Sequence, residues 1–113
     1  DPREHFAAVY LDARHRPIAV HDAAIGTGEG CPIDPRAVFG PALQLSAAAL
    51  VVAHNHPSGD PTPSAEDRAV TERLRSAGEL LGVRLLDHLV IGDGRFFSFA
   101  DECMHAFVQG GRS

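Results

Sequence analysis

The sequence contains no lysine. All ten of its basic residues are arginine, and with fifteen aspartates and glutamates the formal net charge is −5. Because contacts to phosphate supply most of the affinity for duplex DNA, this balance gives no electrostatic case for a large nucleic-acid surface, and only a local arginine patch would favour one. Long apolar runs are missing as well: none approaches the roughly 20 residues that cross a bilayer, and the first residues lack the pattern of a signal peptide. We therefore expect DNA binding to be weak and no membrane partner.

Cysteine is scarce. Cys31 and Cys103 form neither a CxxC pair nor a disulfide framework, so a reducing, cytoplasmic compartment fits best. The 113 residues suit one domain over 1–113, with a tail at about 109–113, and the apolar fraction of 44% is ordinary for a globular protein.

The order of hydrophobic patterns and turn signals predicts interleaved strands and helices. We expect strands over 5–11, 83–91 and 95–99, a strand that begins with residues 17–20 and an apolar strand within 45–53. Helices should begin after Asp34 and run over 64–81, with a short helix over 100–108 and a loop over 26–32. The class is α/β with a mixed sheet flanked by helices. The apolar strand over 45–53 should be central and covered on both faces. Gly40-Pro41 predicts a kink in the first helix.

The stretch 53–67, AHNHPSGDPTPSAED, carries the chemistry. Side chains alternate along a strand, so His54 and His56 point the same way from a strand end. The prolines and glycine that follow force a loop, and the helix beginning at Ser64 brings Asp67 into its first turn. Two histidines and one carboxylate, with water in the fourth position, form the open site of a catalytic zinc. The predicted metal is therefore Zn²⁺, with His54, His56 and Asp67 as ligands.

This His-x-His, seven residues, Ser-x-x-Asp pattern resembles the JAMM signature of MPN/JAB-domain metallopeptidases. The fuller string HNHPSGDPTPS, with LLDHLVIG and FFSFA further on, is similar to the RadC family of that superfamily, over residues from about 3 to about 101. The resemblance implies a single MPN-like domain of cytidine-deaminase-like architecture. It also implies a glutamate near the first strand as the base for a zinc-bound water. Glu4 matches that position, with Glu29 as its rival. Ser64 would then help to stabilise the oxyanion.

Each of these residues has a structural alternative. The two histidines could close a strand without metal, and Glu4 could be a solvated terminal residue. Ser-x-x-Asp is also a capping box, which commits Asp67 to the helix end more than it does Ser64. Asp60 is a rival third ligand. His88 follows Asp87 on a strand, so the two side chains face opposite ways, and His88 either supports the site or is structural.

Three classes of function compete. The first is a zinc metallopeptidase or isopeptidase that hydrolyses an amide bond in a protein or peptide substrate. The second is a non-enzymatic metal-binding module associated with DNA repair, the label that RadC-like proteins have carried. The third, a zinc nucleobase deaminase, needs H-x-E and P-C-x-x-C, and neither is present. The chain could also form a homodimer through a sheet edge.

Overall fold

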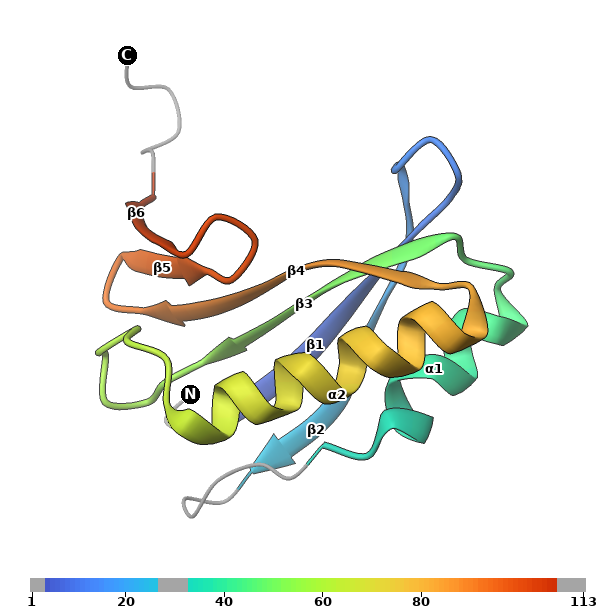
Figure 1. Ribbon diagram of the computed structural model, residues 1–113. Helices are drawn as coiled ribbons and strands as arrows, with labels where there is room; N and C mark the ends of the chain where they lie inside the picture. Colours follow the sequence, from blue (N-terminus) through green and yellow to red (C-terminus); the bar gives the residue numbers. More distant parts are fainter. Residues whose placement is uncertain (1–3, 27–32, 108–113) are drawn as a thin grey trace.

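The structure, a computed structural model, describes residues 4–26 and 33–107 (Figure 1). Its elements are, in chain order, β1 (Glu4–Leu11), β2 (Pro17–Gly26), α1 (Pro35–Gln44), β3 (Ala49–Asn55), α2 (Ala65–Leu81), β4 (Arg84–Gly92), β5 (Arg95–Ser98) and β6 (Cys103–Ala106). The strands form one six-stranded sheet in the order β2-β1-β3-β4-β5-β6. β3 and β4 run parallel and the other neighbours antiparallel, so the predicted mixed α/β sheet is confirmed.

The hydrophobic core lies between the two helices and one face of the sheet. Alternate residues of β1 and β3 point into it together with one side of each helix; the cluster includes Phe6, Ala8, Tyr10, Leu50, Val52, Val38, Phe39, Ala42 and Leu74. In Figure 1 the helices lie side by side along this face. Val9 and Val51 point to the opposite face and are only half-buried. Within the described residues, the prediction that β3 is covered on both faces is therefore wrong, since the helices cover one.

Helix α1 begins as its sequence predicts. The Asp34 side chain accepts a hydrogen bond from the Arg36 backbone N–H, and Pro35 takes the first helical position, where its missing N–H costs nothing. Ile33 and Val38 are both buried in the core, as expected for a hydrophobic staple. The helix continues unbroken through Pro41, and the kink there stays a prediction.

Helix α2 has strong signals at both ends. Ser64 caps its N-terminus, and Gly82 adopts the left-handed conformation that ends it, with φ 76°. Near that end Gly78 is required by packing, because a Cβ there would lie 2.3 Å from the Val83 carbonyl oxygen. Neither this helix nor the other one in the described ranges is long and apolar enough to cross a membrane.

Three predicted segments differ from the structure. β2 begins at Pro17, as predicted, and includes Gly26, at which the predicted loop over 26–32 was expected to begin. β3 lies later than the predicted 45–53, so that it includes His54. The helix predicted over 100–108 is wrong. The chain turns at residues 99–102, with Glu102 at φ 56°, and its backbone then pairs with β5 as β6. The predicted loop over 27–32 lies outside the described residues.

The proline-rich loop after β3 is held against the end of β4. The His56 backbone N–H donates to the Ile91 carbonyl at 2.8 Å. Beside this bond, a Cβ on Gly92 would lie 2.6 Å from the Gly59 carbonyl oxygen. Only glycine permits so close an approach. The loop that leaves His56 therefore has a fixed path across β4.

Candidate metal centre

Two imidazoles meet at the end of β3. His54 is the sixth residue of the strand and points into the core side, whereas His56 follows the last strand residue. Their ring centroids are 4.9 Å apart, as the His-x-His spacing predicts. The His54 side chain is 3% exposed and that of His56 18%, so His54 forms the floor of the site and His56 its edge.

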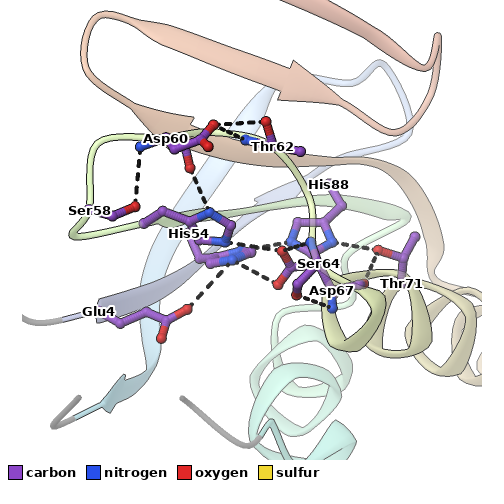
Figure 2. Close-up of polar contacts among 10 residues, drawn as sticks. Glu4, His54, Ser58, Asp60, Thr62, Ser64, Asp67, Thr71 and His88 are labelled. Atoms are coloured by element: carbon purple, nitrogen blue, oxygen red, sulfur yellow. Dashed lines mark hydrogen bonds and ion pairs between the residues drawn. The ribbon is translucent and has the colours of Figure 1, made fainter. Parts of the chain in front are cut away.

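Asp67 contacts both rings from the first turn of α2. Its Oδ1 lies 3.1 Å from His54 Nε2, and its Oδ2 lies 3.0 Å from His56 Nε2. Figure 2 shows this carboxylate between the first turn of α2 and the His54 ring. The structure thus brings the three predicted ligands together at one point.

The capping box is also present, and it serves this arrangement. The Ser64 backbone N–H donates to Asp67 Oδ2 at 2.8 Å, and the Asp67 backbone N–H donates to Ser64 Oγ at 3.0 Å. Capping therefore does not withdraw Asp67 from the histidines. It fixes the carboxylate in front of them, which removes the conflict between the two interpretations of this motif. Ser64 Oγ accepts in the cap and keeps its own proton for donation.

Glu4 reaches the site from the start of β1. Antiparallel pairing sets Phe6 opposite His54, so Glu4, two residues earlier, lies toward His56. Its Oε2 is 3.6 Å from His54 Nε2, farther than the Asp67 oxygen. Ligand atoms of Glu4, His54 and His56 all lie within 4.8 Å of one another. The rival base, Glu29, lies outside the described residues.

Asp60, the rival third ligand, contributes its backbone. Its carbonyl oxygen lies 2.8 Å from His56 Nδ1, while its carboxylate accepts from the Thr62 hydroxyl and backbone N–H. Those bonds from Thr62 hold the pKa of Asp60 below its ordinary value. The Asp60 backbone carbonyl thus orients the His56 ring, while the Asp60 carboxylate is bound to Thr62.

His88 lies directly behind His54. Its Nε2 is 2.9 Å from His54 Nδ1, and its Nδ1 is 2.6 Å from Thr71 Oγ1 on α2. As predicted, Asp87 does not contact the His88 ring: its carboxylate accepts from the His88 backbone N–H, from Ala100 N and from Ser98 Oγ. Burial, followed by the neighbouring His54, lowers the pKa of His88 to about 3, so the ring is neutral at physiological pH.

The Nδ1 proton of His56 forms a hydrogen bond to the Asp60 backbone carbonyl. A backbone carbonyl can only accept, so His56 Nδ1 donates to Asp60 and, in the neutral ring, Nε2 carries a bare lone pair. His56 Nε2 lies 3.0 Å from Asp67 Oδ2, a geometry that suits either a hydrogen bond from a second ring proton or a cation held between the two atoms. His54 Nε2 has no hydrogen-bond partner, and it is the only buried side-chain nitrogen or oxygen of the described residues in this state. Lone pairs aimed at carboxylate oxygens repel them unless a cation lies between.

The site has room for a small ion. A cavity of about 20 Å³ is lined by residues that include Glu4, Phe6, His54, Glu66, Asp67 and His88. About 10–15 Å³ suffices for one water molecule. Bonds of about 2.0–2.1 Å to zinc place neighbouring tetrahedral donors roughly 3.3 Å apart, close to the separations from Asp67 to the two histidines. The donor set and its spacing therefore fit a divalent metal.

The electrostatics of Asp67 agree with such a role. Burial raises the pKa of its carboxyl, but positive charge at His54 Nε2, carried by a ring proton or by a bound cation, and the hydrogen bonds from Ser64 outweigh burial and leave the pKa well below its ordinary value. Asp67 is therefore ionised throughout the physiological range. A ligand carboxylate must be deprotonated, and this one is.

Residues 1–104 match the sequence profile of the RadC-like JAB domain. The chain belongs to that family. It is 57% identical over 98 residues to a UPF0758 protein of Xanthomonas euvesicatoria, covering 87% of this chain and 44% of that protein. UPF0758 proteins of Geobacter sulfurreducens and Shouchella clausii are 48% and 46% identical, over 86% and 95% of this chain and 42% and 46% of theirs. This RadC-like domain thus spans less than half the length of these relatives, whose names state no activity.

Sequence reasoning missed one residue of the RadC-like site. Thr71 was not singled out, yet it is 2% exposed and connects α2 to His88. Its signal was available: it lies four residues after Asp67, one helical turn further along the same face. A hydroxyl on the buried face of a helix needs a partner, and this one binds the ring behind the metal centre.

Proposed function

We propose that this RadC-like domain is a zinc-dependent amide hydrolase, a metallopeptidase or isopeptidase acting on a protein or peptide. The observation that carries the proposal is the unpartnered, buried Nε2 of His54 beside the Asp67 carboxylate. Together with the bare Nε2 of His56, it supports a cation held by His54, His56 and Asp67. Zinc at these residues would supply a Lewis acid for the carbonyl and a lowered pKa for bound water.

The remaining residues suit the roles that amide hydrolysis requires. Glu4, 18% exposed at the side chain, is close enough to the histidines to take a proton from a water at the site and return it to the leaving amine. Ser64 can donate its hydroxyl proton to the oxyanion while its oxygen accepts from the helix. Glu4, His54 and Asp67 line the small cavity, which has no room for a peptide, so a substrate chain would lie across its mouth.

Metal analysis of the purified domain, paired with a peptidase and isopeptidase screen, tests the proposal. We expect about one zinc per chain, lost in the His54→Ala/His56→Ala double variant because two protein ligands are removed. Glu4→Gln should keep the zinc and the fold and lower the rate by roughly two to four orders of magnitude. Glu29→Gln is the matched control and should change little.

Three outcomes would change the proposal in different ways. Full zinc occupancy in the double variant would end the metal assignment. Stoichiometric zinc without hydrolysis of any substrate in the screen would favour the alternative, a non-enzymatic metal-binding module associated with DNA repair. Equal rates for Glu4→Gln and the unmodified domain, with Glu29→Gln inactive, would move the base to Glu29.

A further inference from the structure

A continuous line of hydrogen bonds runs from helix α2 to the metal centre. It passes from the Asp67 carbonyl oxygen through the Thr71 hydroxyl and the His88 ring to the His54 ring, with separations of 2.8, 2.6 and 2.9 Å (Figure 2). His88 is 0% exposed and Thr71 2%. Because buried polar groups cannot exchange these partners for water, the protons along the line are constrained.

At the Thr71 end of the line, the direction in which each hydrogen bond is donated is fixed. Thr71 has a single hydroxyl proton, and the Asp67 carbonyl oxygen, 2.8 Å away, can only accept. If the hydroxyl proton goes there, Thr71 Oγ1 must accept from His88 Nδ1–H. A neutral imidazole has one N–H, so His88 Nε2 is then an acceptor. His54 Nδ1 must donate to it, which leaves His54 Nε2 bare.

The reversed arrangement is disfavoured at the same end. In it Thr71 would donate to His88, His88 Nε2–H would donate to His54 Nδ1, and His54 Nε2 would carry a proton. Two oxygens, Thr71 Oγ1 and the Asp67 carbonyl, would then lie 2.8 Å apart with no proton between them. At the other end Asp67 Oδ1, 3.1 Å away, would attract the Nε2 proton although the ring makes no aligned hydrogen bond, so the Thr71 end decides the direction.

We propose that Thr71 and His88 are positioning residues that hold His54 in the Nδ1–H tautomer and so present a bare Nε2 to the metal. His56 needs no such relay, because the Asp60 carbonyl fixes its ring directly. Partners of this kind raise the basicity of a ligand histidine and fix its orientation. The effect on affinity rests on the proposed metal site, whereas the proton positions are a property of the metal-free protein.

Nitrogen NMR of the metal-free domain measures those positions. In protein labelled with ¹⁵N at histidine and held near pH 8, two-bond proton–nitrogen correlations distinguish protonated from bare ring nitrogens. We expect His54 and His88 each to show a protonated Nδ1 and a bare Nε2. A His54 ring protonated at Nε2 would overturn the proposal, whatever the protein does with zinc.

A matched pair of variants tests the remote residue. Thr71→Val keeps the shape and removes the hydroxyl, whereas Thr71→Ser keeps the hydroxyl. In the valine variant we expect His88 and His54 to lose the single Nδ1–H tautomer and zinc affinity to fall by roughly 10- to 100-fold, the scale for partners of ligand histidines. The serine variant should keep the tautomers and an affinity near that of the unmodified protein. Equal zinc affinities and tautomers in the two variants would overturn the proposal.

A second pair guards against a variant that fails to fold. The glutamine of His88→Gln offers an oxygen to His54 and an N–H to Thr71, whereas His88→Leu offers neither. The glutamine variant should keep the His54 Nδ1–H signal and the leucine variant should lose it. If the unmodified domain shows the expected tautomers but binds no zinc, the proposed function fails while the tautomer assignment stands.

Discussion

Asp67 shows, at the scale of single residues, how one carboxylate can serve a helix and a metal centre together. Its Oδ2 accepts the Ser64 backbone N–H, and its two oxygens face the two histidines. From the sequence, Ser-x-x-Asp predicted either a capping box or a ligand, and nothing in the spacing chose between them. The choice was unnecessary because a carboxylate has about four acceptor positions, enough for both.

His88 makes the metal-free domain sensitive to acid. Burial is the main cause that lowers its pKa from 6.5 to about 3. Between those values the unfolded chain binds a proton that the folded protein does not, so the free energy of unfolding should fall as the pH drops below about 6.5. The slope attributable to this one group is at most about 1.4 kcal/mol per pH unit.

Urea unfolding of the metal-free domain between pH 7.5 and 5 measures that slope. The His88→Gln variant lacks the titrating ring and should show a weaker dependence on pH over the same range. If both proteins lose stability at the same rate with falling pH, other groups cause the effect.

The residues proposed as ligands could be found from the sequence, whereas the residues that support them could not. His54, His56 and Asp67 follow from local periodicity and helix signals within fifteen consecutive residues. The contact between His88 and His54 joins positions 34 apart, and it depends on the parallel pairing of β3 with β4. The register of two strands distant in the sequence depends on the tertiary fold, and a single sequence predicts it poorly.

At the scale of elements, the N-terminus of α2 carries a cap and a catalytic candidate in one residue. Ser64→Ala removes the oxygen that accepts the Asp67 backbone N–H and should lower the free energy of unfolding by about 1 kcal/mol. If the hydroxyl also donates to the oxyanion, the rate should fall by roughly a hundredfold or more.

Denaturant unfolding and steady-state rates separate these two effects. Ser64→Thr keeps the hydroxyl and serves as the control for both. A stability loss with an unchanged rate would leave Ser64 as a helix cap alone.

The contact between the proline loop and β4 gives a second prediction at this scale. Gly92→Ala would place a Cβ 2.6 Å from the Gly59 carbonyl oxygen, so the loop that positions His56 must shift. We expect a loss of roughly 1–3 kcal/mol of stability, the usual scale of overpacking. Thermal and denaturant unfolding measure it.

Gly40→Ala is the matched control for that change. No heavy atom lies within 4 Å of a Cβ at this helical position. Alanine should therefore stabilise α1 by about 0.5–1 kcal/mol. Equal effects of the two substitutions would mean that the loop does not press on β4.

The elements themselves were largely predictable, apart from the C-terminal one. Caps at Asp34 and Ser64 and the left-handed Gly82 are local signals, and all three appear in the structure. The predicted helix over 100–108 failed because an apolar segment of that length is ambiguous, and pairing with β5 decided its state. The half-buried face of β3 was missed for a related reason: apolar residues such as Val51 predict burial but not which element provides it.

For the whole molecule, the charge sets an expectation about DNA. With a net charge of −5 and no lysine, the domain should bind duplex DNA only weakly, with dissociation constants of roughly 10⁻⁶ M or weaker at physiological salt. Fluorescence anisotropy with a labelled duplex measures this. Submicromolar binding that weakens steeply with salt would reveal a dominant arginine patch and promote the repair-associated function.

The strand order places the residues of the candidate site in parts of the fold that open at different free energies. His54 belongs to β3, where its backbone is paired with Phe6 on one side and Val90 on the other, so it can leave only when the centre of the sheet opens. His56 and Asp67 lie beyond the strand end, in a loop and in the first turn of a helix, which open at lower free energy. His54 therefore stays in place as long as the sheet does, and the opening of His56 and Asp67 would set how quickly an ion held by the proposed site is exchanged.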